Sequence, residues 1–313
     1  MLALLFPGQG SQEVGMGRDA FDASPAAREV FEAADAALGF SLSRICFEGP
    51  DSELLRTEIQ QPAILTTSIA LLRALEERGA VEAAFVAGHS LGEYSALVAS
   101  GSLPFEDAVR LVQARGRFMQ EAVAEGHGAM AAVMGCPADV VEQACRLVAQ
   151  ETGRVVAPAN YNGTAQTVIA GDVAAVELAC SRAKKDGAKR SVALPVSAPF
   201  HCELMAPAAG KLALELAAVR FSDPAPPVIT NVEASPNADG ERVAELLRQQ
   251  VTAPVRFVEM VQTLAREGVT RVLEIGPGRV LSGLVRRIDR KLECQGLSLS
   301  AEVPLAASFA AGG

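Results

Sequence analysis

Short apolar runs alternate with longer amphipathic segments along most of the chain, and this pattern predicts strands that are followed by helices. The apolar runs have the length of buried strands and lie at 3–6, 83–87, 227–230, 271–275 and 296–299. Segments with helical periodicity lie at 25–38, 62–79, 105–123, 203–219, 240–250, 256–267 and 279–288, and a helix-compatible run that follows the turn after 83–87 continues to about Ser100. Such an alternation is typical of an α/β domain. The small-residue tail from Ala306 to Gly313 is expected to fray.

The pattern changes between residues 127 and 197. Strands are predicted at 128–134, 155–162, 166–170 and 189–196, and helices at 137–150 and 172–186. This order, β-α-β-β-α-β, is typical of a ferredoxin-like unit. Because α/β patterning resumes afterwards, we expect 127–197 to be a small subdomain inserted into a large domain made of 1–126 and 198–313. A chain of 313 residues is also longer than a typical single core.

One serine, Ser90, stands between a predicted strand and a predicted helix with a glycine two residues away on each side. Gly88-His89-Ser90-Leu91-Gly92 therefore matches the G-x-S-x-G nucleophile elbow. A Cβ at either flanking position would clash in so sharp a turn. The following backbone N–H groups, at a helix N-terminus, would face developing negative charge. The alternative is a turn with a purely structural role, and the strand and helix around it favour a nucleophile.

The first strand also runs into a glycine-rich loop, at 7–15, a position that often binds nucleotide phosphates. The dinucleotide fingerprint requires a glycine where Glu13 stands, and the P-loop requires a lysine where Met16 stands. Both nucleotide-binding interpretations are therefore excluded. The loop can instead approach another backbone or an oxyanion closely.

Arg115 lies on the apolar stripe of the helix predicted at 105–123. The stripe repeats at the spacing of one helical face, and Arg110 and Arg117 lie on other faces. A buried guanidinium is costly unless it is paired. Arg115 is thus either a core residue bonded to carbonyls or an internal carboxylate, or a cation that receives a substrate carboxylate in a bidentate contact.

A serine nucleophile requires a base, and histidine is the usual one. His89 adjoins Ser90 but leaves the turn in another direction, so we expect a structural role. His127 lies among glycines at the start of the insert, where a surface position is expected. His201, which follows the insert and precedes a helix, is the strongest candidate. No acidic residue is marked by the sequence as the third member of a triad.

Composition narrows the class of protein. Half of the residues are apolar, 21% are charged and the net charge is −9, which describes a globular enzyme and argues against nucleic acid as the main partner. The six cysteines are scattered and the three histidines lack metal-ligand spacing, so we expect a reduced cytoplasmic protein without a metal. No run is long enough to span a membrane, and the N-terminus reads as a strand rather than a signal peptide.

Taken together, the motifs resemble those of the malonyl-CoA:acyl-carrier-protein transacylases, in the same order and over about residues 3 to 300. They are Gly8-Gln9-Gly10-Ser11-Gln12, Gln61-Pro62, Gly88-His89-Ser90-Leu91-Gly92-Glu93-Tyr94, Arg115, Asn160-Tyr161-Asn162, Pro199-Phe200-His201 and Glu274-Ile275-Gly276-Pro277-Gly278. The resemblance implies an α/β-hydrolase-like parallel sheet domain with a ferredoxin-like insert. It also implies malonyl transfer from malonyl-CoA to an acyl carrier protein for fatty acid synthesis, without a cofactor.

The resemblance further assigns roles in a two-step transfer. Ser90 would carry the acyl group, and His201 would act as general base and then as general acid. A main-chain carbonyl, that of Gln250, would orient the histidine in place of a carboxylate. The oxyanion would be bound by the backbone N–H groups of Gln9 and Leu91.

The same resemblance assigns the acyl specificity. Arg115 would bind the free malonyl carboxylate, and Gln61 and Asn160 would border the site. Gln61 precedes a proline, so it is expected to be extended at the start of its helix. Phe200 resembles the malonyl-type pattern, in which bulk near the α-carbon disfavours an α-methyl group. One methyl supplies only about 1–3 kcal/mol of discrimination, so methylmalonyl would be excluded incompletely.

The carrier protein of this family is acidic, so we expect a local basic patch on this acidic chain to dock it. One cluster lies in the insert and one near the C-terminus, namely Arg182, Lys184, Lys185, Lys189 and Arg190, and Arg279, Arg286, Arg287, Arg290 and Lys291. Each is otherwise an ordinary solvated helix face. On the resemblance alone we expect a monomer.

Three other functions fit parts of the pattern. A free-standing acyltransferase of a polyketide synthase would use the same chemistry with a different carrier. A serine esterase would hydrolyse its acyl-enzyme rapidly, and a buried Arg115 argues against it. A carrier-binding subunit with an inactive site is disfavoured because Ser90, His201 and Arg115 are all present.

Overall fold

The computed structural model describes residues 1–196 and 198–312. Within this part a mainly parallel sheet has the order β10-β9-β1-β2-β7-β8, in which only β8 is antiparallel to its neighbour. Its strands are β1 (Leu2–Phe6), β2 (Phe85–Gly88), β7 (Val228–Ile229), β8 (Pro236–Asn237), β9 (Arg271–Ile275) and β10 (Glu293–Leu297). In the central register Leu4 lies between Val86 and Leu273.

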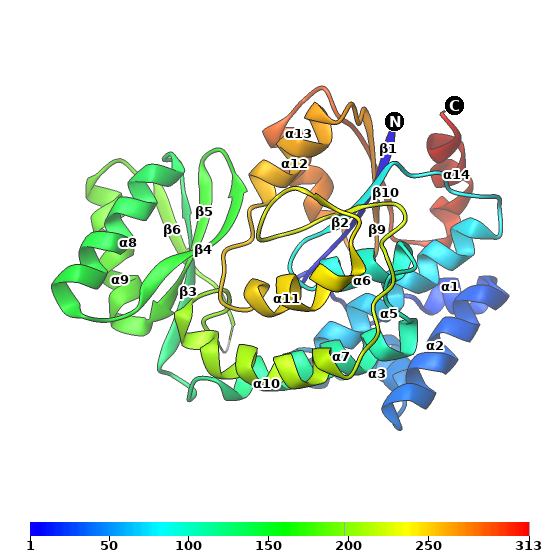
Figure 1. The fold of residues 1–313 in the computed structure, drawn as a ribbon, viewed down its shortest axis with the longest axis horizontal. Coiled ribbons are helices and arrows are strands. Elements are labelled where there is room, and N and C mark those ends of the chain that lie inside the picture. The colour runs from blue at the N-terminus through cyan, green and yellow to red at the C-terminus, as the bar shows by residue number, and fades with distance from the viewer. Residues whose placement is uncertain (197, 313) are drawn as a thin grey trace.

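Helices cover both faces of this sheet, so successive residues of β1 enter two different cores. Leu2, Leu4 and Phe6 pack with the helices of one face, and Ala3 and Leu5 pack with α12 and α13 on the other. Figure 1 shows the sheet between these layers. The helices are α1 (Arg18–Ala23), α2 (Pro25–Leu38), α3 (Leu42–Glu48), α4 (Asp51–Leu54), α5 (Thr57–Glu76), α6 (Gly92–Ala99), α7 (Phe105–Glu121), α10 (Ala206–Ala217), α11 (Gly240–Gln250), α12 (Phe257–Arg266), α13 (Val280–Ile288) and α14 (Val303–Ala311), with short 3₁₀ turns at Glu203–Met205 and Ser300–Glu302.

A separate antiparallel sheet lies at the left of Figure 1, with the order β4-β5-β3-β6. Its elements are β3 (Gly128–Met134), α8 (Ala138–Thr152), β4 (Val156–Gly163), β5 (Gln166–Asp172), α9 (Val173–Lys185) and β6 (Arg190–Ala193). This confirms the predicted β-α-β-β-α-β order, and the two sheets together confirm the predicted fold class. The division into 1–126 with 198–313 and 127–197 stays a prediction, and its boundary residue Ser197 lies outside the described residues.

Two local predictions are wrong. Gln61 is not extended before a helix, because α5 begins at Thr57 and includes both Gln61 and Pro62. A proline in the second turn removes one N–H donor, and burial of almost the whole helix outweighs that loss. The C-terminal tail is also not frayed throughout. α14 buries Val303 and Ala306 against the core, and its last turn accepts a hydrogen bond from Arg271.

Candidate active site

Ser90 occupies a sharp turn between β2 and α6. Its φ of 51° lies in the left-handed region, which costs a non-glycine residue energy and is common at functional sites. A Cβ on Gly88 would lie 2.0 Å from the carbonyl of Gly92, and one on Gly92 would lie 2.1 Å from the carbonyl of Phe6. The steric reason that the sequence gives for both glycines is therefore confirmed.

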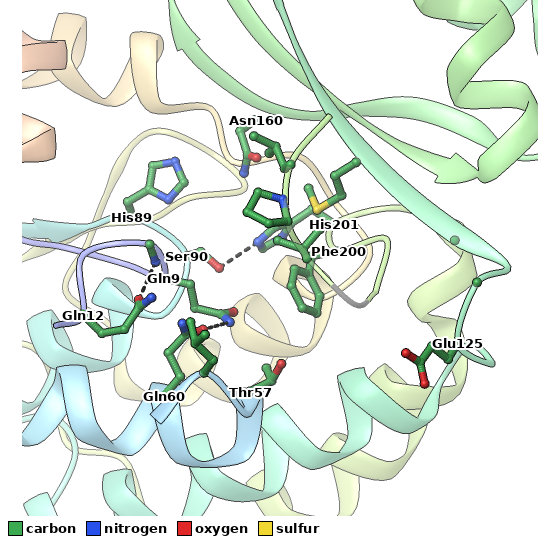
Figure 2. Close-up of a pocket in the computed structure, with 18 residues that line it drawn as sticks. Gln9, Gln12, Thr57, Gln60, His89, Ser90, Glu125, Asn160, Phe200 and His201 are labelled. Atoms are coloured by element: carbon green, nitrogen blue, oxygen red, sulfur yellow. Dashed lines mark hydrogen bonds between the residues drawn. The ribbon is translucent and has the colours of Figure 1, made fainter. Parts of the chain in front are cut away.

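His201 faces this serine. Its Nε2 lies 2.7 Å from the Oγ of Ser90, and its Nδ1 lies 2.8 Å from the main-chain carbonyl oxygen of Gln250. A carbonyl only accepts, so Nδ1 carries the proton and Nε2 is left to accept the serine O–H. Figure 2 shows the imidazole directed at Ser90 across the floor of a cavity. The pair can thus deprotonate the serine hydroxyl without a carboxylate.

The His201 imidazole is expected to remain neutral well into the acid range. Burial, followed by the positive charge of Arg115, lowers the pKa of His201 to about 3. Both effects disfavour the charged form, so the shift is downward. An NMR titration of the ring nitrogens should show no protonation of His201 between pH 8 and pH 5. In an Arg115→Ala variant the pKa should rise, and a normal titration near 6.5 in the unmodified protein would contradict the neutral ring.

Arg115 is fully buried on α7, as the stripe predicts, and its guanidinium points at the nucleophile. One terminal nitrogen donates to the Oε1 of Gln61 at 2.8 Å. The other donates to the Oγ of Ser90 at 3.0 Å and to the Oε1 of Gln250 at 2.9 Å. All three acceptors are neutral, and burial lowers the pKa of the guanidinium. A buried cation held only by neutral groups beside a nucleophile is a suitable receptor for an anionic acyl group.

Two backbone donors near Ser90 are unoccupied. Neither the N–H of Gln9 nor that of Leu91 has an acceptor among the described residues. The N–H of Ser90 itself is taken by the Oδ1 of Asn231 at 2.6 Å. Gly8 lets the loop of Gln9 come close, because a Cβ there would lie 2.4 Å from the carbonyl of His89. This pair of free donors suits an oxyanion hole.

A cavity of about 810 Å³ opens over Ser90, with a size usual for a small-molecule site. Figure 2 shows its polar side chains converging from the first loop, α5, the elbow and the insert. Of the residues that the sequence assigns to the site, the cavity is lined by Gln9, Ser90, Asn160, Phe200 and His201. The others are buried behind this lining and are Gln61, Leu91, Arg115 and Gln250.

The remaining histidines and Cys202 do not form part of the Ser90–His201 pair. The Nε2 of His89 donates to the Oδ1 of Asn162 at 2.8 Å and the ring packs against Phe257, so His89 links the elbow to β4 rather than serving Ser90. His127 is exposed. Cys202 is buried, and burial raises the pKa of its thiol to about 11, which makes it a poor nucleophile. Among the described residues no cluster of His, Cys, Asp and Glu could hold a metal ion.

Sequence reasoning missed two buried polar residues of the site, Glu93 and Asn231. Asn231 follows β7 and bonds both sides of the elbow, through the N–H of Ser90 and the carbonyl of Gly88 at 2.7 Å. Glu93 lies in the first turn of α6, and burial raises the pKa of its carboxyl to about 7. Asn231 could have been suspected from the sequence, because it follows a predicted strand and the functional residues of parallel sheets lie at the carboxyl ends of strands.

Some residues of the two predicted basic clusters are exposed, and others form ion pairs or hydrogen bonds. Lys184, Lys185, Lys189 and Arg190 are exposed, whereas Arg182 pairs with Glu151. Near the C-terminus Arg279 pairs with Glu302, and the exposed Arg286 donates to the carbonyl of Cys294. In the part of the chain that the structure describes, no helix is long and apolar enough to cross a membrane.

Comparison with known proteins places this site in a family. The acyl transferase domain matches residues 3–301. The malonyl CoA-acyl carrier protein transacylase of Bacillus subtilis is 49% identical over 97% of this chain and 96% of its own, and that of Escherichia coli K12 is 48% identical over 95% of each. A malonyl-transacylase solved in complex with a type II PKS acyl-carrier protein is 43% identical, with a TM-score of 0.95 over 98% of this chain and 99% of that chain. The chain therefore belongs to the acyl transferase family, together with the malonyl CoA-acyl carrier protein transacylases.

Proposed function

We propose that this enzyme transfers the malonyl group of malonyl-CoA to the phosphopantetheine thiol of an acyl carrier protein, for fatty acid synthesis. The observation that carries the proposal is the hydrogen bond from the buried guanidinium of Arg115 to the Oγ of Ser90. A cation at this distance from the nucleophile selects acyl groups that carry a carboxylate. The names of the relatives from Escherichia coli K12 and Bacillus subtilis support the same substrate and carrier.

The first half-reaction loads Ser90. Its Oγ attacks the thioester carbonyl while the Nε2 of His201 takes the hydroxyl proton. The N–H groups of Gln9 and Leu91 bind the oxyanion of the tetrahedral intermediate. Collapse of the intermediate expels the CoA sulfur, which receives the proton from His201, so malonyl-Ser90 and CoA-SH are the products.

The second half-reaction reverses these steps with a different thiol. The Nε2 of His201 takes the proton of the carrier's phosphopantetheine thiol, whose sulfur attacks the malonyl-Ser90 ester. The same two N–H groups bind the oxyanion, and the Oγ of Ser90 leaves with the proton from His201. The carbonyl of Gln250 keeps the imidazole in one tautomer through both halves.

The acyl group is selected where it meets Arg115. A malonyl carboxylate would form a charge-assisted bidentate contact with the guanidinium, which Gln61 and Gln250 hold in place. Gln61 holds the guanidinium from α5, and Asn160 closes the cavity from the insert. Phe200 lines the cavity next to His201 and would crowd an α-methyl group, with the limited discrimination that one methyl allows.

The carrier is proposed to dock on exposed cations, because an acidic partner and an acidic chain otherwise repel each other. Lys184, Lys185, Lys189 and Arg190 form one candidate surface, and Arg286 and Arg287 belong to the other. A monomer stays an expectation drawn from the resemblance, and a cytoplasmic location stays one drawn from the scattered cysteines.

A carrier from polyketide synthesis is the second candidate acceptor. It is favoured by one observation, the likeness to the malonyl-transacylase that was solved with a type II PKS acyl-carrier protein. The chemistry at Ser90 would be identical. Only the identity of the carrier would differ.

The proposed function predicts a two-stage experiment. Exposure to malonyl-CoA should add one malonyl group to the protein, seen by intact mass, and a phosphopantetheinylated acyl carrier protein should then remove it within the dead time of manual mixing. Fatty acid and polyketide carriers are compared at equal concentration, with Lys184→Glu/Lys185→Glu and Arg286→Glu/Arg287→Glu variants to locate the docking surface. Loss of the label to water before any carrier is added would instead indicate a serine esterase.

A further inference from the structure

Glu93 is a buried carboxylate whose contacts lead to the catalytic groups. Its side chain is 2% exposed, and its Oε2 accepts hydrogen bonds from the backbone N–H of Asn231 at 3.0 Å and from the Nε2 of Gln250 at 2.6 Å. Burying a carboxylate is costly, and hydrogen bonds such as these two offset part of the cost. The reaction steps at Ser90 and His201 do not involve it. The reason for its position must therefore lie in what it holds.

The side-chain amide of Gln250 is the group that Glu93 holds most closely. Its Nε2 donates to Glu93 and, at 3.1 Å, to the carbonyl of Ser90, while its Oε1 accepts from Arg115 at 2.9 Å. An arginine can only donate, and the Oε2 of Glu93, at which two donors are directed, accepts. Only one of the two orientations of the amide satisfies both neighbours. Glu93, which accepts the shorter of the two hydrogen bonds of this NH₂ group, thus favours, with the carbonyl of Ser90, the orientation in which an oxygen faces the guanidinium.

We propose that Glu93 is a positioning residue that acts through the side-chain amide of Gln250 to hold Arg115 in the geometry that receives the acyl carboxylate. The inference rests on the proposed function of Arg115. Without Glu93 the amide of Gln250 loses the shorter of the two hydrogen bonds that its NH₂ group donates, and rotation that directs this NH₂ group at Arg115 becomes easier. Donor would then face donor, and the guanidinium would turn away from Ser90.

A second contact of Glu93 supports the turn at Ser90. Its loss would lower the loading rate of every acyl group alike. Through the N–H of Asn231 it fixes the loop whose Oδ1 binds the N–H of Ser90. The contact through Gln250 also reaches the carbonyl of Ser90, but its hydrogen bond with Arg115 matters most to an acyl group that carries a carboxylate. Comparing an acyl group that has a carboxylate with one that lacks it therefore separates positioning of Arg115 from general support of the fold.

The test measures the rate of Ser90 loading by malonyl-CoA and by acetyl-CoA, with quenched-flow intact mass. For Glu93→Ala we expect malonyl loading to fall about tenfold to hundredfold more than acetyl loading, the usual result of a misplaced binding group. Glu93→Gln keeps an oxygen that accepts both hydrogen bonds, so malonyl loading should stay within about fivefold of the unmodified protein. Glu106→Ala removes an exposed carboxylate at the start of α7 and is the matched control.

A second variant tests the proposal independently, in case Glu93→Ala does not fold. Gln250→Leu removes the amide but keeps the main-chain carbonyl that faces His201, and it should show the same selective loss with malonyl-CoA. Equal losses for the two acyl groups in either variant would overturn the proposal, as would a Glu93→Gln variant as impaired as Glu93→Ala. Failure of malonyl-CoA to label the unmodified protein would instead refute the proposed function itself.

Discussion

Replacing Ser90 with alanine is expected to abolish the malonyl-enzyme and to lower turnover by roughly 10⁴- to 10⁶-fold, as for other serine nucleophiles. The only oxygen held 2.7 Å from the Nε2 of His201 would be removed, so no other described hydroxyl could be deprotonated in its place. Intact mass after exposure to malonyl-CoA should show the unmodified protein alone. Turnover is followed by transfer of labelled malonyl to a carrier.

The control for this substitution is Ser100→Ala. Ser100 is also buried, at the end of α6, where its hydroxyl donates to the carbonyl of Leu97 at 3.0 Å. Its loss removes a local hydrogen bond and should leave loading unchanged. A malonyl group that remains on the Ser90→Ala protein would show that the nucleophile lies elsewhere.

Local chemistry made some of this site predictable from the sequence. Gly88 and Gly92 are required by contacts with backbone only a few residues away or on the neighbouring strand. Their spacing in the sequence is therefore enough to predict the turn. The burial of Arg115 follows from the periodicity of α7, which has polar residues on its other faces. Features that depend on short-range sterics or on one amphipathic helix can be inferred from sequence in this way.

Other features depend on distant contacts that no periodicity encodes. Ser90 and His201 are 111 residues apart, with the insert between them. Comparison of the three histidines favoured His201 as the base, and the family resemblance then assigned its role. Glu93 was missed because α6 is buried on all sides, so its pattern cannot distinguish an exposed glutamate from an enclosed one. The burial of α5 likewise overrode the local effect of Pro62 on Gln61.

Replacing Arg115 with alanine is expected to change which acyl groups are loaded. The malonyl carboxylate would lie in a buried site without its cation, and breaking such a pair costs about 3–5 kcal/mol, or roughly 150- to 5,000-fold in loading rate. Acetyl loading involves no carboxylate, so it should change far less. The ratio of the two rates, measured by intact mass against time, is the quantity to compare.

Two matched variants refine this expectation. Arg115→Lys keeps the charge but loses the planar pair of donors, so it should recover only part of the malonyl rate. Arg117→Ala removes an exposed arginine two residues along the same helix and should leave the ratio unchanged.

Stability must be followed with each variant, because Arg115 is fully buried and its removal also leaves a cavity. A general weakening of the fold would lower both rates together, and a thermal melt would reveal it. Equal losses for malonyl and acetyl would contradict a role in carboxylate binding. A loss confined to malonyl, in a protein that still melts cooperatively, would mean that Ser90 supplies acyl transfer and that Arg115 determines which acyl group is transferred.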